Sequence, residues 1–331
     1  MTLKIKCIST CLLLSFLAIL GCNNDNTTQT VQEKAPVKIP VFSADSTFTY
    51  LEKQLSFGPR NPGSEGHVAC KDWMVSKFKS LGAKVIAQDF TAHIYTGDSY
   101  PAWNIIAQYN PSHKKRVILS AHWDTRFIGE EDSDPNKKDK PIPGADDGGT
   151  GTAVLIEIAR ILNENPIDLG VDIILWDAED QGQRGVVNDR LWCLGSQHWS
   201  KNKHKKNYKA QYGINLDMVG AKNPRFGKEL NSQKYARATV EKLWTLAQNM
   251  GYGDMFVNDP TGPMTDDHLF VCQIAKIPML DVINSPLGNK NAFIKEWHTH
   301  DDDISKIDKR SLRVVGQVVT AAIYKESTGH F

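Results

Sequence analysis

The stretch VDIILWDAED, residues 171–180, decides the fold. It begins with a nearly unbroken apolar run and ends with three acids within four positions. The run shows no clean period-two alternation, which indicates a strand covered on both faces, as in a parallel sheet flanked by helices. Such sheets bind ligands beyond the carboxyl ends of their strands, where Asp177, Glu179 and Asp180 lie. The stretch predicts a buried strand that delivers carboxylates to a cleft, although taken alone it fits a polar loop after a core strand equally well.

Glu179 and Asp180 are neighbours, and this limits what they can do together. Successive side chains of a strand point to opposite faces, so the two acids cannot do the same job unless the chain turns between them. We therefore expect one of them to hold a metal and the other to handle a proton.

Strands and helices alternate along the rest of the chain. Apolar runs predict further strands over residues 83–91, 103–109, 116–122, 213–219 and 277–283. Helical periodicity predicts helices over residues 46–55, 66–81, 152–162, 235–250 and 312–324. This alternation after residue 116 favours an α/β fold with a mainly parallel central sheet and helices on both faces.

Length and charge narrow the class of protein. The chain has 331 residues and 40% hydrophobic content, enough for one large core, so we expect a single catalytic domain over residues 42–331. Its net charge of +1 gives no bulk attraction to nucleic acids. The basic run 201–209 has too few aromatic residues for base stacking, so a solvated loop outweighs a nucleic-acid patch about fourfold. We expect a monomer without a nucleic-acid partner.

The first residues resemble a targeting signal rather than part of the folded domain. Two lysines precede the apolar run 12–20, which is too short to span a bilayer comfortably. Its ending, ILGC at 19–22, resembles a bacterial lipoprotein signal, in which the cysteine is lipidated. We expect a signal peptide over 1–21, a flexible tether over 22–41 and a cell-envelope location, periplasmic or outer-membrane, with membrane contact only through lipid on Cys22. The alternative is an ordinary secretory signal cut nearby.

Three cysteines remain in the expected mature domain, namely Cys70, Cys193 and Cys272. None lies in a CxxC spacing, which argues against a zinc ribbon and allows at most one disulfide. A buried cysteine packs by default as a small hydrophobic side chain, and we expect this of all three.

Acids and histidines gather at five places that fall at predicted strand ends or in loops. These are His122-Trp-Asp124, Asp146-Asp147, Glu179-Asp180, Asp217, and the pair of segments Asp266-Asp267-His268 and Trp297-His298. Carboxylates and imidazoles without thiolates suit a catalytic zinc, which takes three protein ligands and keeps one position open. Each piece alone is commonplace, because an HxD is more often a polar pair and a DDG more often a turn. Their order and spacing together predict a metal site.

That ordered set resembles the zinc aminopeptidase family and, within its fold, the glutaminyl-peptide cyclotransferases. The resemblance runs from about residue 51 to the C-terminus. The family pattern has an HxD, an acid at a helix start, an acidic pair after a strand, an Asp on the next strand and a late His. Here these are His122 and Asp124, Asp147, Glu179 and Asp180, Asp217 and His298.

Several local features are similar to the cyclases, and to bacterial members of the animal-type cyclases in particular. They are AHWDTR at 121–126, LGSQHW at 194–199, DMVGA at 217–221, TDDHLF at 265–270 and Trp297 before His298. The resemblance implies one zinc per chain, held by Asp147, Asp180 and His298. It implies Glu179 as the acid/base, Asp217 and Asp266 as an acidic hydrogen-bonding network, and Trp297 as a wall of the substrate pocket. His122 and Asp124 would then be supporting groups or ligands of a second metal.

The chain also departs from the animal cyclases. Asp180 stands where they carry Glu, and Ala121 stands where they carry a disulfide cysteine. The tryptophan that follows their acidic pair is missing, unless Trp192 replaces it. The resemblance implies conversion of N-terminal glutamine of peptides or proteins to pyroglutamate with release of ammonia. A zinc aminopeptidase is the main alternative, because all of its ligand types are present, and a non-catalytic role is the third.

Overall fold

A computed structural model of the chain describes residues 37–186, 189–287 and 293–331. Residues Val37–Phe331 form one compact unit. The expected signal peptide, Cys22 and most of the expected tether lie outside the described residues. Within the part of the chain that is described, no helix is long and apolar enough to cross a membrane.

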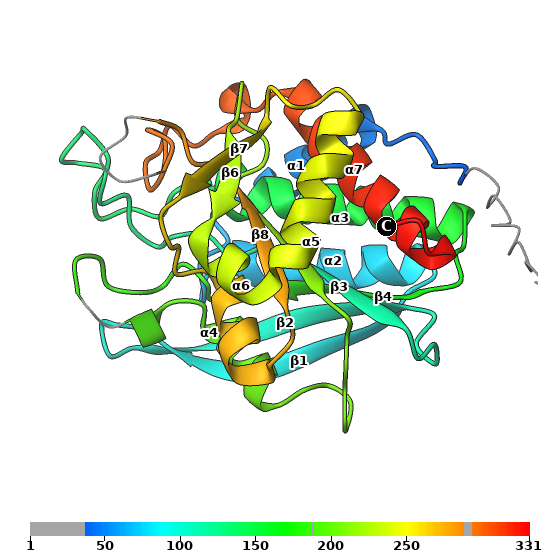
Figure 1. The fold of residues 1–331 in the computed structure, drawn as a ribbon. Helices are drawn as coiled ribbons and strands as arrows, with labels where there is room; N and C mark the ends of the chain where they lie inside the picture. The colour runs from blue at the N-terminus through cyan, green and yellow to red at the C-terminus, as the bar shows by residue number, and fades with distance from the viewer. Residues whose placement is uncertain (1–36, 187–188, 288–292) are drawn as a thin grey trace, which may run out of the picture. The chain divides into compact units, whose positions relative to one another are not determined.

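A six-stranded sheet forms the centre of the fold (Figure 1). Its strands are β1 (Lys84–His93), β2 (Ser99–Tyr109), β3 (Arg116–His122), β4 (Gly170–Trp176), β5 (Gly213–Asp217) and β8 (Met279–Ile283), in the order β1-β2-β4-β3-β5-β8. The β4, β3, β5 and β8 strands run parallel to one another, as predicted. The β1 and β2 strands extend this sheet in antiparallel fashion, because a short turn joins them as a hairpin.

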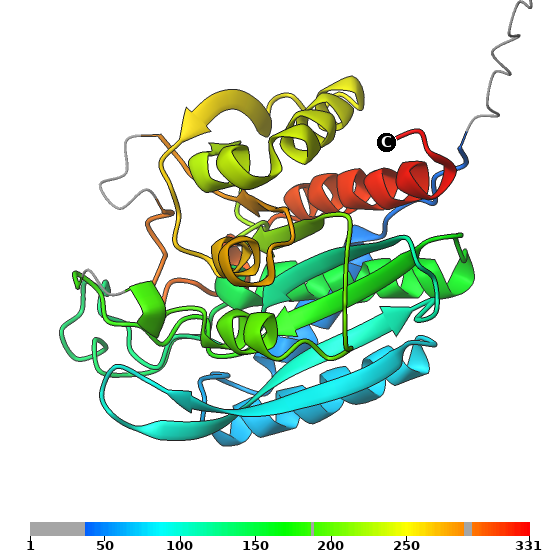
Figure 2. The same cartoon turned by 60° about the horizontal axis from the view of Figure 1, so that its bottom comes forward.

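Helices cover both faces of the sheet, and Figure 2 shows the helix of residues 65–80 alongside β1 and β2. The helices are α1 (Ala44–Leu55), α2 (Glu65–Ser80), α3 (Gly151–Glu164), α4 (Leu194–Lys201), α5 (Leu230–Asn249), α6 (Asp267–Phe270) and α7 (Lys309–Thr328). The central strand β4 alternates between two cores. Ile173 and Leu175 pack into the core shared with α2, α3 and α7, whereas Ile174 and Trp176 pack against Trp199 of α4 on the other face. Both faces of β4 are thus buried, which explains, as predicted, why apolar and polar residues do not alternate along this strand.

The helix boundaries follow local chemistry. The α2 helix begins after Ser64, whose hydroxyl accepts a hydrogen bond from the amide of His67 at 3.1 Å, and it ends before Gly82, which has φ +77°. The sequence did not predict a second, two-stranded sheet of β6 (Phe226–Glu229) and β7 (Phe256–Thr261). These strands lack a long apolar run, and most of β7 faces solvent.

Candidate active site

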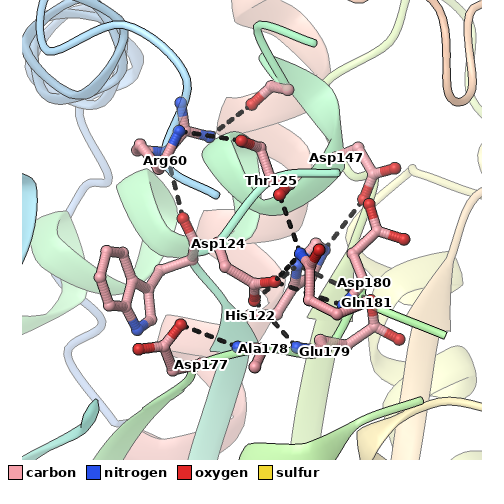
Figure 3. A network of polar contacts seen from close by, with 12 residues as sticks. Arg60, His122, Asp124, Thr125, Asp147, Asp177, Ala178, Glu179, Asp180 and Gln181 are labelled. Atoms are coloured by element: carbon pink, nitrogen blue, oxygen red, sulfur yellow. Dashed lines mark hydrogen bonds and ion pairs between the residues drawn. The ribbon is translucent and has the colours of Figure 1, made fainter. Parts of the chain in front are cut away.

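The carboxyl ends of β3, β4 and β5 meet at one edge of the sheet and bring the predicted residues together (Figure 3). His122 ends β3 and Asp217 ends β5. Beyond β4 the chain turns sharply, because Ala178 has φ +53°, a left-handed conformation that is rare for a residue with a side chain. The sharp turn comes one residue earlier than the turn between the two acids considered from the sequence, and both Glu179 and Asp180 line the same cavity.

One trio of potential metal ligands forms around His122. Its Nε2 lies 3.0 Å from an oxygen of Asp147 and 3.1 Å from an oxygen of Asp217. Burial lowers the pKa of His122, but its hydrogen bonds to the carboxylates of Asp124, Asp147 and Asp217 outweigh this effect and raise the pKa well above its ordinary value.

A second trio shares Asp147 and adds Asp180 and His298. The Nε2 atom of His298 lies 2.8 Å from Asp180 Oδ1 and 3.8 Å from Asp147 Oδ2. Its other ring nitrogen, Nδ1, lies 3.0 Å from a carboxylate oxygen of Glu130. A carboxylate on the far nitrogen fixes the ring and its tautomer, which is the usual arrangement around a metal-binding histidine.

The backbone of Asp147 is held by hydrogen bonds to Asp302. The turn Asp146–Thr150 precedes α3, and the amides of Asp146 and Asp147 donate to the buried carboxylate of Asp302 at 2.8 and 3.1 Å. Gly148 follows with φ +80°, and a Cβ there would lie 2.5 Å from the carbonyl oxygen of Asp124. Only glycine fits this approach, which explains the DDG sequence.

Arg60 supports the same loops from behind (Figure 3). Its fully buried guanidinium donates to the carbonyls of Trp123, Pro143 and Gly144 at 3.1, 3.0 and 2.6 Å. These carbonyls belong to the segments that carry Asp124 and Asp147. The arginine therefore satisfies backbone acceptors that loops of this shape would otherwise leave unpaired in the interior.

Asp124 belongs to neither trio. Its carboxylate accepts hydrogen bonds from the amides of Glu179 and Asp180 at 3.0 and 3.3 Å and from Gln181 Nε2 at 2.9 Å. It lies 3.8 Å from Nδ1 of His122. Asp124 thus fixes the backbone of the acidic pair.

Glu179 is enclosed on most sides. Its Oε1 accepts a hydrogen bond from the thiol of Cys193 at 3.2 Å, and its Oε2 lies 3.9 Å from His122 Nδ1. Burial raises the pKa of Glu179 well above its ordinary value; the charge of His122 opposes this, and the nearby acids reinforce it. A carboxyl group with a raised pKa can accept and return a proton near neutral pH.

Asp217 and Asp266 complete the acidic surface. Burial raises the pKa of Asp217 to about 7, against the hydrogen bond from His122 and with the help of the Asp266 and Asp147 charges. Asp266 caps α6, and both of its oxygens lie 3.3 Å from Nδ2 of Asn215. Both acids line the same cavity as Glu179.

The cavity has a volume of about 380 Å³, which suits a small side chain rather than a long peptide. Asp147, Glu179, Asp180, Asp217, Asp266, Trp192 and Trp297 are among its lining residues. The Trp297 ring stacks on His298 with a centroid separation of 3.5 Å. Trp192 packs over Gly182, where a Cβ would lie 2.2 Å from the indole, and it also covers the guanidinium of Arg126. The cavity therefore joins an acidic floor to aromatic walls.

Sequence reasoning did not single out three groups of this site, namely Arg60, Glu130 and Asp302. Their partners Trp123, His298 and Asp146 lie 63, 168 and 156 residues away in the sequence. Cys193 is buried, as expected of a cysteine that packs as a small hydrophobic residue, but its thiol also donates to Glu179, which the sequence did not predict. The three described cysteines are free, so no disulfide forms among them.

The second trio fits a metal ion. Its ligand atoms all lie within 4.8 Å of one another. Asp147 Oδ2 and Asp180 Oδ2 are buried and have no hydrogen-bond partner, which is costly unless a cation satisfies them. Two carboxylates and one imidazole are a ligand set typical of catalytic zinc.

The similarity of this chain to known proteins also indicates a zinc enzyme. Residues 104–323 match the model described as peptidase family M28. The solved structure of a Zn-dependent exopeptidase from Parabacteroides distasonis is 44% identical, with a TM-score of 0.85, over 87% of this chain and 99% of that one. A glutaminyl cyclase of Bacteroides thetaiotaomicron, solved with N-acetylhistamine bound, is 42% identical, with a TM-score of 0.84 over the same shares. Among curated proteins, the glutaminyl-peptide cyclotransferase of Gloydius blomhoffii is 25% identical over 78% of this chain and 75% of its own length.

Proposed function

This chain belongs to peptidase family M28, and from that premise we propose that it is a zinc-dependent glutaminyl-peptide cyclotransferase. Its substrates are peptides or proteins that begin with glutamine, and its products are pyroglutamyl chains and ammonia. The observation that carries the proposal is the cavity of about 380 Å³, which has room for an N-terminal glutamine residue and is lined by the acids Glu179, Asp217 and Asp266 and by Trp192 and Trp297. The similarity to glutaminyl cyclases over most of the chain supports it.

We assign one zinc to Asp147, Asp180 and His298. The unpartnered oxygens of both acids belong to this trio, and Glu130 orients its histidine. In both trios the Nε2 atom of the histidine contacts an acid, but the nearest carboxylate to Nδ1 is 3.0 Å away at His298 and 3.8 Å away at His122. When bound, zinc supplies a Lewis acid that polarises the γ-amide of the substrate.

The residues of the chain handle the protons. The free α-amine of the substrate attacks the γ-amide carbon, and a new C–N bond closes the ring. Glu179 accepts a proton from this amine and returns it to the departing nitrogen, so that the old C–N bond breaks and ammonia leaves. Asp217 and Asp266 accept hydrogen bonds from the N–H groups of the substrate. Trp297 and Trp192 form the walls that exclude the rest of the peptide from the cavity.

An aminopeptidase is the second candidate, and one observation favours it. Asp147 lies between two trios of ligands, as it would if it bridged two metal ions. The 44% identity to a Zn-dependent exopeptidase is in line with that alternative. The two activities differ in nucleophile, because hydrolysis needs an activated water whereas cyclisation uses the α-amine of the substrate.

Peptides that differ only in their first residue test the proposal. The purified protein is incubated with a Gln-initiated and a Leu-initiated peptide, and ammonia and free amino acids are quantified. We expect ammonia from the first peptide and no free amino acid from either. Free leucine or free glutamine at a comparable rate would instead assign the chain to the aminopeptidases.

A further inference from the structure

The chain segment that carries the acidic pair is held by a second segment alongside it. The amides of Cys193, Leu194 and Gly195, at the start of α4, donate to the carbonyls of Glu179, Ala178 and Asp177 at 2.8, 3.0 and 3.0 Å. Three successive amides thus pair with three successive carbonyls across the bend that follows β4. The position of Glu179 depends directly on this pairing.

Each of the two segments contains one non-glycine residue in the left-handed backbone conformation. Ala178 has φ +53° and Cys193 has φ +55°. Such strained residues persist only where surrounding contacts over-determine them, and they concentrate at functional sites. At Cys193 the strained backbone turns the side chain toward Glu179.

The contact between these two side chains is specific. Cys193 is fully buried, and its Sγ lies 3.2 Å from Oε1 of Glu179, whose other oxygen lies 3.9 Å from His122 Nδ1. Glu179 lines the cavity, so the thiol reaches the carboxylate from the protein interior. Burial raises the pKa of the Cys193 thiol well above its ordinary value, and the nearby acids add to this. The sulfur therefore keeps its proton and can only act as the donor.

We propose that Cys193 is a positioning residue for the general base: its thiol occupies Oε1 of Glu179 and leaves Oε2 as the oxygen that exchanges protons with the substrate. This role rests on the proposed function, because it presupposes that Glu179 is the acid/base. It also gives Cys193 a function beyond packing, and it predicts that a better donor at the same place preserves catalysis.

Two substitutions at Cys193 and one control test this role. Cys193→Ala removes the donor, and we expect kcat to fall about 3- to 10-fold, the usual effect of losing one hydrogen bond. KM and zinc content should stay unchanged, and Cys193→Ser, which restores a donor, should recover most of the loss. The control is Cys272→Ala, which removes another buried thiol that donates to the carbonyl of Met279 at 3.4 Å, and it should keep the wild-type kcat. A wild-type kcat in folded Cys193→Ala, or an equal loss in the control, would overturn the proposal.

A double variant separates positioning from general destabilisation. If Cys193 acts only through Glu179, Cys193→Ala should add no further loss of kcat in the Glu179→Gln background. A loss of the same size in both backgrounds would contradict the proposal, since it would show that the thiol acts elsewhere.

Infrared spectroscopy tests the contact between Cys193 and Glu179 directly, even if Cys193→Ala does not fold. The S–H stretching band that disappears in Cys193→Ser should lie at lower frequency than the one lost in Cys272→Ala, because a hydrogen bond to a carboxylate is stronger than one to a carbonyl. A band at the position of a free thiol would overturn the contact itself. If the wild-type protein released no ammonia while this band was shifted, the proposed function would have failed and the contact would stand.

Discussion

Glu179 and Asp180 are adjacent in the sequence but have different partners in the structure. Glu179 contacts the thiol of Cys193, whereas Asp180 contacts the imidazole of His298 at 2.8 Å. The chain bends at Ala178, directly before the two acids, and both of them line one cavity. The division agrees with one acid that moves protons and one that holds the metal.

Substitutions of the two acids should therefore have different effects on turnover and on zinc binding. Glu179→Gln keeps the shape of the side chain but cannot accept a proton, so kcat should fall about 10²- to 10⁴-fold while zinc stays bound. Asp180→Ala should lose the zinc as well. Metal analysis and turnover of both variants check this, and a Glu179→Gln protein without zinc would reverse the assignment.

The pH dependence of the rate follows from the raised pKa of Glu179. A general base works only in its charged form, and a raised pKa means that this form is lost at a higher pH than for an ordinary carboxyl group. We expect kcat/KM to fall on the acid side with an apparent pKa above about 4.3, the ordinary value for glutamate. The residual activity of Glu179→Gln should lack this acid limb. An identical limb in the variant would assign it to another group.

Glu130 is expected to act on the metal through His298. Its Oε1 lies 3.0 Å from Nδ1 of that histidine and 2.7 Å from the guanidinium of Arg126. Glu130→Gln should weaken zinc binding about 10- to 100-fold, the usual effect of removing such a partner. Competition with a chelator measures this. Glu131→Gln, whose carboxylate pairs with Arg184, is the control and should bind zinc as the wild type does.

Among single residues of the site, those at the ends of strands can be predicted from the sequence more readily than those in loops. His122, Glu179, Asp180 and Asp217 follow apolar runs, and the topology of a parallel sheet brings such positions together. Glu130 lies 168 residues from His298, and Asp302 lies 156 residues from Asp146. No local pattern marks such pairs, because their contact arises only when distant loops fold onto one edge of the sheet.

Among the elements, all six strands of the central sheet were predicted within a few residues, whereas the two strands of the small second sheet were not. Continuous apolar runs identify β3, β4, β5 and β8, which are buried throughout. The β6 and β7 strands are short, and the exposed part of β7 reads VNDPT, which has a turn composition. What stabilises this region is tertiary contact with α5 rather than local propensity.

Glu229 at the start of α5 joins several of these elements. Its buried carboxylate accepts hydrogen bonds from the amides of Asn231, Ser232 and Met264 at 2.8, 2.5 and 2.9 Å. Burial alone would raise its pKa, but the hydrogen bond and charge of His268, together with the amides, lower it to about 2. Because the folded pKa lies below the unfolded one, Glu229 stabilises the fold above about pH 4.3, and this stabilisation is lost as the pH falls toward 2.

Replacing Glu229 should therefore have a pH-dependent cost. At pH 7, Glu229→Gln should lower the free energy of unfolding by about 3 kcal/mol, the equivalent of the pKa shift. The difference from the wild type should shrink below about pH 4.3, because the unfolded wild type then takes up a proton that the folded protein binds only near pH 2. Urea unfolding of both proteins between pH 7 and pH 3 measures it. A difference that does not change with pH would mean that the charge of Glu229 contributes nothing.

For the molecule as a whole, we propose a lipid anchor at Cys22 and a place in the cell envelope. The proposal rests on the sequence ILGC at 19–22, after a short apolar run, and on the polar stretch that follows. Cys22→Ala should move the protein from the membrane fraction to the soluble fraction. Fractionation of cells that express either form tests this, and retention of the variant in the membrane would contradict the anchor.

The central claim is that this chain closes an N-terminal glutamine into a ring and does not remove it. The most direct measurement is the mass spectrum of a Gln-initiated peptide whose side-chain amide carries ¹⁵N, after incubation with the purified zinc-loaded protein. We predict a product that keeps every residue and has lost one molecule of labelled ammonia, with the α-nitrogen retained in the ring. A peptide shortened by its first residue, or a substrate left unchanged, would contradict the claim.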